Sequence, residues 1–264
     1  METNVVQRWR DRRGVYRPAG EVINTRLYEV AAIPDDTTVR VFVEQHHYLA
    51  SMPAARERFG LYEGPFLAGV AVFSQPVNDA VLGRLPCDRE EGVELGRLVL
   101  LDRVPGNGES FFVSRCFELL RRQGYRGVIS FSDPLRREDD AGRVVCPGHV
   151  GTVYQALNAI YTGRGTPRTL RVLRTGQVLS ARTLQKIRAQ ERGHAAAEKL
   201  LVRAGAEPRQ AGEEPRTWLA AWLPRISRTI RHPGCHRYAF GLDRRVRRML
   251  PASLPYPKLC MEAA

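Results

Sequence analysis

The sequence of 264 residues predicts an α/β fold (α+β) with a mixed, twisted central sheet flanked by helices. Two observations support this prediction. Strand patterns and helix patterns alternate along the chain in the order strand, helix, hairpin, strand, loop and helix, strand, helix, strand. A charged, helix-patterned stretch then precedes one more apolar strand, which predicts a basic helical insertion before the last strand.

The clearest strand–loop–helix pattern covers residues 92–127, and the other elements are arranged around it. Residues 93–101 alternate and then become apolar on both sides, which is typical of a strand buried on both faces. Residues 102–108 have turn composition, and the apolar stripe that follows predicts a helix ending at Gly124. Unpaired amides at a helix N-terminus attract anions, so this loop predicts either a pyrophosphate site or an ordinary turn without a ligand.

The residues before this unit predict a smaller set of elements. Residues 1–20 are basic and aperiodic, which predicts a mobile or loosely packed arm. A first strand is expected at 28–33, a helix at 34–49, and a hairpin at 59–73 that turns at 63–65.

The residues after the unit predict the rest of the sheet and the insertion. A buried strand is expected at 127–131, an irregular charged stretch at 135–147, a helix at 149–162, and short strands at 169–173 and 177–179. A charged helix capped by Ser180 is expected through 204, a helix at 214–230 broken by Pro224, and a final strand at 236–242. The expected organisation is a basic arm at 1–20, a core at 21–179, the insertion at 180–232, and a last strand with a basic tail at 233–264.

Composition indicates the class of partner. The net charge of +13 predicts a polyanionic partner. GC-rich coding would explain the preference for arginine over lysine, but not the excess of positive charge. Five scattered cysteines argue against a disulfide framework, and no apolar run is long enough for a membrane span or a signal peptide. We therefore expect a protein of the cytoplasm with no membrane partner.

The element order resembles the GNAT acyltransferase fold, with residues 92–127 in the place of its CoA-binding strand and helix. A narrower resemblance rests on four stretches, which are HHYL at 46–49, ELGRLVL followed by NGES, SFSDP at 130–134, and GHVGTVYQALNAIYTG at 148–163. Together they resemble the phage Mom family of DNA modification proteins. Residues 136–146 look inserted relative to that pattern.

The resemblance implies an activity and a donor. Members of that family convert the exocyclic N6 amine of adenine in phage DNA to a carbamoylmethyl group, which protects the DNA from restriction. It implies a GNAT-like transferase that uses acetyl-CoA or a related donor, and it also associates iron with the family. The donor residues that it implies are Arg97, Leu98, Val99, Leu100, Gly106, Asn107, Gly108 and Ser110.

The adenine amine is a poor nucleophile because its lone pair is delocalised into the ring, so it needs a proton acceptor. Asp133, at the end of a buried strand, fits that role, although an Asp-Pro pair can equally cap a loop. The base must leave the duplex to reach a pocket. The remaining residues assigned to the site are His47, Tyr48, Tyr154 and Ser114 for catalysis and His149, Gln155 and Asn158 for substrate binding, with packing or a solvated helix position as the structural alternative.

Clustered cations predict the DNA-binding surface, because phosphates would neutralise their mutual repulsion. These residues are Arg182, Lys186, Arg188, Arg244, Arg245, Arg247 and Arg248. A merely soluble surface is the alternative. The pairs Cys146 with His149 and His232 with Cys235 would suit zinc, but their separation favours coincidence, and no metal ligand set is assigned.

Two other functions remain open from the sequence. One is an acyltransferase for a protein or small amine on the same fold, and the other is a non-catalytic DNA-binding protein on a GNAT scaffold. Double-stranded DNA with a flipped adenine is the expected partner under the favoured function.

Overall fold

The computed structural model describes residues 5–11, 13–18, 20–76 and 78–258. Its contacts divide the chain into two units, each built from separate stretches. Unit 1 comprises Met1–Pro134, Gly148–Gly165 and Cys235–Ala264, and unit 2 comprises Leu135–Pro147 and Thr166–Gly234. No helix in the described part is both long enough and apolar enough to cross a bilayer.

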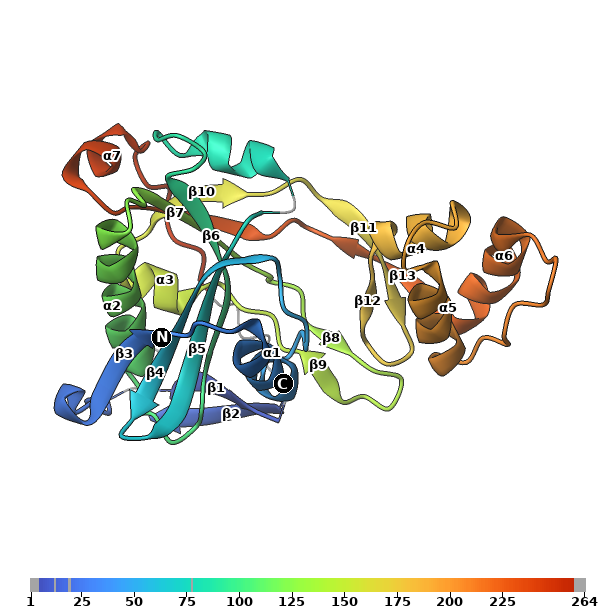
Figure 1. Cartoon of the computed structure of the whole chain (residues 1–264), viewed down its shortest axis with the longest axis horizontal. Helices are drawn as coiled ribbons and strands as arrows, with labels where there is room; N and C mark the ends of the chain where they lie inside the picture. The colour runs from blue at the N-terminus through green and yellow to red at the C-terminus, as the bar shows by residue number, and fades with distance from the viewer. Residues whose placement is uncertain (1–4, 12, 19, 77, 259–264) are drawn as a thin grey trace. The chain divides into compact units, whose positions relative to one another are not determined.

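Unit 1 is built on a seven-stranded sheet in the order β10-β14-β7-β6-β5-β4-β3 (Figure 1). The strands are β3 (Tyr28–Ala32), β4 (Ala55–Glu63), β5 (Phe66–Ser74), β6 (Gly92–Leu100), β7 (Gly127–Ser132), β10 (Ile160–Arg164) and β14 (His236–Gly241). Within this sheet β6 and β7 run parallel, whereas the other neighbours are antiparallel. The predicted mixed, twisted sheet with flanking helices is confirmed.

Two helices cover opposite faces of the sheet. Successive residues of a strand face opposite sides, and β5 shows this directly. Its Val70 and Val72 pack with Val39 and Val43 of α1 (Asp36–His46). Its Ala71 and Phe73 instead belong to the core formed with Phe112, Val113, Cys116 and Leu120 of α2 (Gly108–Arg122).

The last strand of the sheet comes from the C-terminal part of the chain. β14 inserts between β7 and β10 and pairs with β7 over its whole length, from His236 opposite Ser132 to Gly241 opposite Gly127. The short helix α7 (Arg244–Met249) follows, and the tail then returns to β10, where Leu254 N donates to Tyr161 O at 3.0 Å. The C-terminal residues therefore complete the interior and one edge of unit 1.

Five further elements complete unit 1. They are β1 (Val5–Arg10) and β2 (Arg13–Pro18), which form an antiparallel hairpin, the 3-10 helices η1 (Thr25–Leu27) and η2 (Asp79–Arg84), and the short helix α3 (Thr152–Ala156). The prediction of a loosely packed arm at 1–20 is therefore wrong for the described residues around Arg8. The Arg8 side chain is only 1% exposed and contacts the loop before α2. Arg12, in the same predicted arm, lies outside the described residues.

Unit 2 has its own sheet and its own core. Three helices gather beside the sheet β12-β11-β13 (Figure 1), and Trp218, Leu201, Ile187 and Leu173 pack between them. Its elements are the small hairpin β8 (Arg137–Glu138) and β9 (Val144–Cys146), the strands β11 (Arg168–Leu173), β12 (Val178–Leu179) and β13 (Ser227–His232), and the helices α4 (Ala181–Arg188), α5 (His194–Arg203) and α6 (Pro215–Ile226). The predicted insertion at 180–232 lies inside this unit.

Three predicted helices are wrong in extent. Only α3 (Thr152–Ala156) forms in 149–162, because Asn158 turns left-handed at φ 55° and β10 follows. The helix predicted for 180–204 is two helices, because Gln190 and Gly193 take φ 49° and 88°. The helix predicted for 214–230 ends at Ile226, and its last residues instead form the start of β13.

Candidate functional site

The strands β6 and β7 pair at one end and separate at the other. Their ladder runs from Gly92 opposite Gly127 to Leu95 opposite Ser130, and no further β6 residue pairs with β7. A bulge marks the point of separation, since Val72 of β5 pairs with Arg97 and Phe73 with Leu95, which leaves Gly96 as the extra residue. The gap beyond Ser130 is the centre of the candidate site.

A side chain at Gly96 would prevent this bulge. A Cβ there would lie 2.5 Å from Ser74 Oγ and 3.3 Å from Pro53 Cγ. Glycine therefore permits the close approach that turns β6 away from β7.

Two charged residues of β6 flank the bulge. Arg97 donates to Ser51 O at 2.8 Å and to its own neighbour Gly96 O at 2.6 Å. Burial lowers the pKa of Arg97, and burial raises the pKa of Glu94, although the nearby charge of Arg97 partly opposes the shift in Glu94. Glu94 therefore keeps its proton to a higher pH than an exposed carboxyl group does. Glu94 is not among the site residues predicted from the sequence, because its burial depends on the fold.

His47 and Tyr48 come from the end of α1. The imidazole of His47 is 5% exposed and stacks on the Tyr48 ring at 4.4 Å, and its Nδ1 accepts the Leu49 amide at 3.1 Å. Burial lowers the pKa of His47 well below its usual value, and the charges of Arg97 and His149 lower it further. His47 is therefore neutral at pH 7 and lies close enough to Arg97 and His149 to respond to their charges.

His149 and Asp133 are tied together at the end of β7. The amide of His149 donates to the backbone carbonyl of Asp133 at 2.8 Å. Burial lowers the pKa of His149 to about 4, the Asp133 charge opposes that shift, and the charge of His236 adds to it. This places a neutral imidazole and a carboxylate near one another after the strand. The insertion between SFSDP and GHVG does not separate them.

Tyr154 of α3 reaches the same gap. It is 6% exposed, and its ring lies 5.3 Å from the ring of Tyr238. Burial raises the pKa of Tyr154, the charge of Glu94 adds to the shift, and a side-chain hydrogen bond with Ser130 opposes it. Ser130 also donates to Leu95 O at 3.1 Å, so this hydroxyl links the end of the β6–β7 ladder to Tyr154. Ser130 is the first residue of the SFSDP motif, but no role was predicted for it from the sequence.

Three other predicted residues take different positions. Gln155 directs its amide nitrogen to Val150 O, Tyr238 Oη and Pro257 O at 3.1, 3.3 and 3.1 Å, so it anchors the C-terminal tail. Asn158 is an exposed left-handed turn residue, and Ser114 is exposed on α2. The structure does not bring these three side chains to the gap through any contact among the described residues.

The loop before α2 already binds a carboxylate. Gly106 N donates to Glu21 Oε2 at 3.0 Å. Arg17 donates to the same carboxylate from Nε to Oε2 at 2.7 Å and from Nη2 to Oε1 at 2.5 Å. The Arg17 hydrogen bonds hold the pKa of Glu21 below its usual value. Asn107 accepts the Ile23 amide at 2.8 Å and makes no side-chain cap for α2. An anion thus lies where the sequence predicts a pyrophosphate, and it comes from the chain itself.

Arg8 is a second arginine at this loop. Arg8 donates to Pro105 O at 2.7 Å and pairs with Glu109, yet its buried Nε has no hydrogen-bond partner among the described residues. Gly108 is packed rather than open, because a Cβ there would lie 2.4 Å from Val104 Cγ1. The other predicted donor residues lie on the separated end of β6 (Leu98, Val99 and Leu100) and in the first turn of α2 (Ser110).

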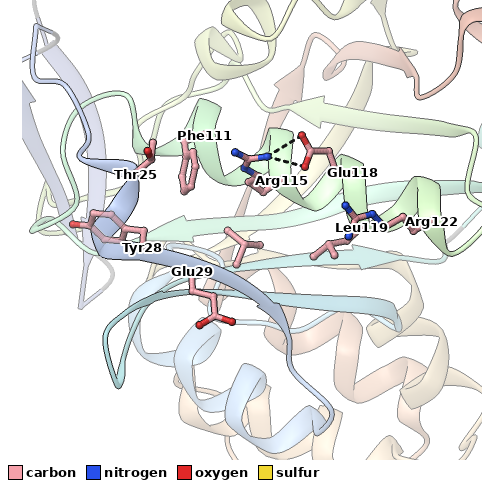
Figure 2. Close-up of a pocket in the computed structure, with 9 residues that line it drawn as sticks. Thr25, Tyr28, Glu29, Phe111, Arg115, Glu118, Leu119 and Arg122 are labelled. Atoms are coloured by element: carbon pink, nitrogen blue, oxygen red, sulfur yellow. Dashed lines mark hydrogen bonds and ion pairs between the residues drawn. The ribbon is translucent and has the colours of Figure 1, made fainter.

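A pocket of about 340 Å³ lies elsewhere in unit 1, between β3 and the outer side of α2 (Figure 2). Tyr28 and Phe111 line it, and Arg115 pairs with Glu118 at 2.9 Å on its wall. None of the predicted catalytic residues lines this pocket. The point where β6 separates from β7, which these titratable groups surround, is therefore the stronger candidate for the functional site.

The predicted DNA-binding residues fall in both units. Arg182, Lys186 and Arg188 lie on α4 in unit 2, and Arg244, Arg245, Arg247 and Arg248 are exposed on α7 in unit 1. Across the described ranges, no three His, Cys, Asp or Glu side chains gather closely enough to hold a metal ion.

Comparison with known proteins agrees with the motifs. The model of the Mom protein family matches residues 27–258. No curated protein matches the chain. Similar solved structures include an N-acetyltransferase from Staphylococcus aureus Mu50, at 12% identity over 71% of this chain and 68% of that one with a TM-score of 0.31.

Two further structures cover more of the chain. A tandem GNAT protein from the clavulanic acid biosynthesis pathway has 10% identity over 82% of this chain and 99% of that one, with a TM-score of 0.39. An acetyltransferase from Bacillus subtilis in complex with CoA has 10% identity over 81% and 97%, with a TM-score of 0.31.

Proposed function

Because the chain belongs to the Mom protein family, we propose that it is a phage-type transferase that modifies the N6 amine of adenine in DNA with a carbamoylmethyl-type group. The observation that carries this proposal is the cluster at the β6–β7 gap. The half-buried carboxyl group of Glu94, the imidazoles of His47 and His149 with their lowered pKa values, and the buried Tyr154 lie around it, and Asp133 directly follows β7.

These groups suit the deprotonation of a weakly nucleophilic amine. The amine loses a proton as its nitrogen forms the new bond, so an acceptor must lie within hydrogen-bond reach. Asp133 is the proposed acceptor, with Glu94 as the next group able to take the proton. His47 and Tyr48 present stacked rings that a flipped base can pack against, and Tyr154 provides a hydroxyl at the gap.

The proposed donor is acetyl-CoA or a related CoA-linked molecule. Along 96–100 the edge of β6 forms no ladder with β7 in the described part of the chain, and the loop before α2 offers the Gly106 amide with Arg8 and Arg17. Attack of the amine on an acetyl thioester would break the C–S bond, release CoA and leave an N-acetyl group. A carbamoylmethyl group would instead form by attack on a methylene carbon of a related donor that already bears the carboxamide, with the leaving group departing from that carbon and the amine proton passing to the acceptor. The chain's own part is to hold the donor phosphates at this loop, which requires Glu21 to leave Gly106.

The test is mass spectrometry of nucleosides from host DNA after expression. The parent chain should produce a new adenine adduct, and Asp133→Asn should lower its amount at least 100-fold with the fold retained by circular dichroism. Glu29→Gln is the matched control, because it also exchanges a carboxylate for an amide, lies at an exposed position of β3 and should leave the adduct unchanged. DNA without any adduct after expression of the parent would overturn the proposal, and adduct formation by the Asp133 variant would remove that residue from the mechanism.

A further inference from the structure

The helices α4 and α5 form a compact helix–turn–helix in unit 2. The turn 189–193 reverses the chain, with Gln190 and Gly193 in the left-handed region at φ 49° and 88°. Leu184 and Ile187 of α4 pack in one core with Ala197 and Leu201 of α5. Two consecutive packed helices joined by a short glycine-containing turn are the layout in which many DNA-binding proteins present their second helix.

The acidic side chains of this motif are paired with cations of unit 2. Glu191 of the turn pairs with Arg182 at 2.6 Å. Glu198 of α5 pairs with Arg209 at 3.2 Å and accepts the side-chain amide of Gln190 at 3.2 Å. Their charges are therefore neutralised while they fix the turn.

The motif also carries cationic side chains that are exposed and not used in these ion pairs. Arg188, Arg192, Lys199 and Arg203 are exposed, and no carboxylate of the described residues lies within ion-pair distance of them. Residues 195, 199 and 203 follow a four-residue step, so Ala195, Lys199 and Arg203 form one stripe along α5. The small side chains of Ala195 and Ala196 leave the start of this stripe uncovered.

The net charge of unit 2 indicates that the partner bound by α4 and α5 is a polyanion. Unit 2 holds 17 of the 41 lysines and arginines but 8 of the 28 acidic residues, which is a net +9 of the chain's +13. It holds less than a third of the residues. An unpaired cationic stripe on a helix is costly in isolation and is stabilised when phosphates replace its counterions.

We propose that α4, the turn and α5 are a module that binds double-stranded DNA, with α5 lying in the major groove. A helix of ten residues is about 15 Å long and fits that groove. Ala195 and Ala196 let the start of α5 approach the base edges, and Lys199 and Arg203 bind phosphates or guanine. The inference rests on the proposed function for DNA as the substrate, and it adds the element that selects the sequence around the modified adenine.

The first experiment measures the affinity of the full chain for a 20-base-pair duplex against salt concentration. Lys199→Ser with Arg203→Ser should weaken binding at least 10-fold and lower the slope of log affinity against log salt by roughly two. The control removes two charges from unit 1 by Arg121→Ser with Arg122→Ser, which lie exposed at the end of α2 and should leave the slope unchanged. Equal slopes for the Lys199 and Arg203 variant and the parent would overturn the inference.

The second experiment separates groove binding from phosphate binding. Duplexes with glucosylated 5-hydroxymethylcytosine carry sugars in the major groove at unchanged charge, so the parent should bind them at least 10-fold more weakly. Arg244, Arg245, Arg247 and Arg248 replaced together by serine should lower the salt slope but keep this sensitivity to the sugar. Equal affinity of the parent for both duplexes would contradict an α5 in the major groove, as would binding to an acidic protein and not to DNA.

The failure of the inference differs from the failure of the proposed function. If DNA binding responds as described but the parent yields no adenine adduct, the modification proposal fails and the module stands. If the adduct forms and the Lys199 and Arg203 variant modifies the same sequences at the same rate, the module fails and the modification proposal stands.

Discussion

At the residue scale, burial has shifted the protonation of the groups around the β6–β7 gap in a consistent direction. The pKa of Glu94 is raised by burial, and the pKa values of His47 and His149 are lowered by burial. Each shift favours the neutral form of its side chain. The cluster is therefore suited to accepting and passing a single proton from a neutral amine, rather than to binding a charged substrate.

Glu94→Gln tests whether this carboxyl group, with its raised pKa, takes part in proton transfer. The amide has the same shape but cannot accept a proton, so the rate of adduct formation should fall about 100-fold with little change in stability. Because only the ionised carboxylate accepts a proton, the parent rate should decrease as pH falls through the raised pKa of Glu94. Kinetics of adduct formation between pH 5 and 8 measure this. An unaltered rate in the Gln variant at every pH would leave Glu94 a structural residue.

His149 should make the protein sensitive to acid. Its folded pKa of about 4 lies below the value of 6.5 expected when unfolded, so the unfolded chain binds more protons between these pH values. The contribution of neutral His149 to the free energy of unfolding is thus fully present above pH 6.5, and it is lost as pH falls towards 4. Urea midpoints should drop over this range, and less steeply in His149→Asn. His47 shifts in the same direction, so part of the slope should remain. A slope identical to that of the parent would contradict the buried neutral imidazole.

At the element scale, the loop between β6 and α2 controls access to the proposed donor site. The carboxylate of Glu21 lies on the Gly106 amide, and it is held there by Arg17. A negative side chain at this position competes with any phosphate. Substituting Gly108 would be a poor probe of the loop, because a Cβ collides with Val104 whether or not a ligand binds.

Glu21→Gln should therefore strengthen donor binding. The neutral amide repels phosphate less and frees Arg17 to contact it, so the affinity for CoA should rise about 10-fold, as titration calorimetry would measure. Glu29→Gln removes the same charge from an exposed position of β3 and serves as the control. A weaker or unchanged affinity in the Glu21 variant would place the donor phosphates away from this loop.

The elements also show what the sequence can predict. Periodicity located β3, α1, the β4–β5 hairpin, β6, α2, β7 and β14, because each has a regular apolar pattern and a clear end signal. It failed where a non-glycine residue takes a left-handed conformation, as at Asn158 and Gln190, since neither residue type requires a turn. Of the site, Asp133, His47, Tyr154 and His149 were predicted through motifs. Glu94 and the role of Glu21 depend on burial and on contacts between distant residues, which one sequence does not reveal.

At the scale of the whole molecule, charge and core are divided unevenly between the units. Unit 2 carries most of the net charge and buries Trp218, Leu201 and Ile187 in a core of its own. The titratable cluster lies entirely in unit 1. Damage to the core of unit 2 should accordingly affect DNA binding before it affects the donor site.

Leu201→Ala tests this division. Leu201 is fully buried, so its truncation should cost unit 2 about 2–5 kcal/mol of unfolding free energy. Trp218 and Trp222 both lie in unit 2, and the fluorescence transition in urea should shift to lower concentration while the CoA affinity stays within twofold. Lys199→Ala, exposed on the same helix, should leave the transition in place. Loss of CoA binding together with the shift would show that the two units unfold as one.

The position of β14 has a consequence for synthesis on the ribosome. β7 is complete at Ser132, but its partner β14 begins at His236, after every residue of unit 2 has been translated. Until then the nascent chain presents β7 as an unprotected edge, which is a site for aberrant pairing with other chains. A premature stop codon between residues 165 and 235 should thus yield an aggregating product rather than a shortened enzyme, even though the titratable residues of the gap, Glu94, Tyr154 and Asp133, are all upstream of it.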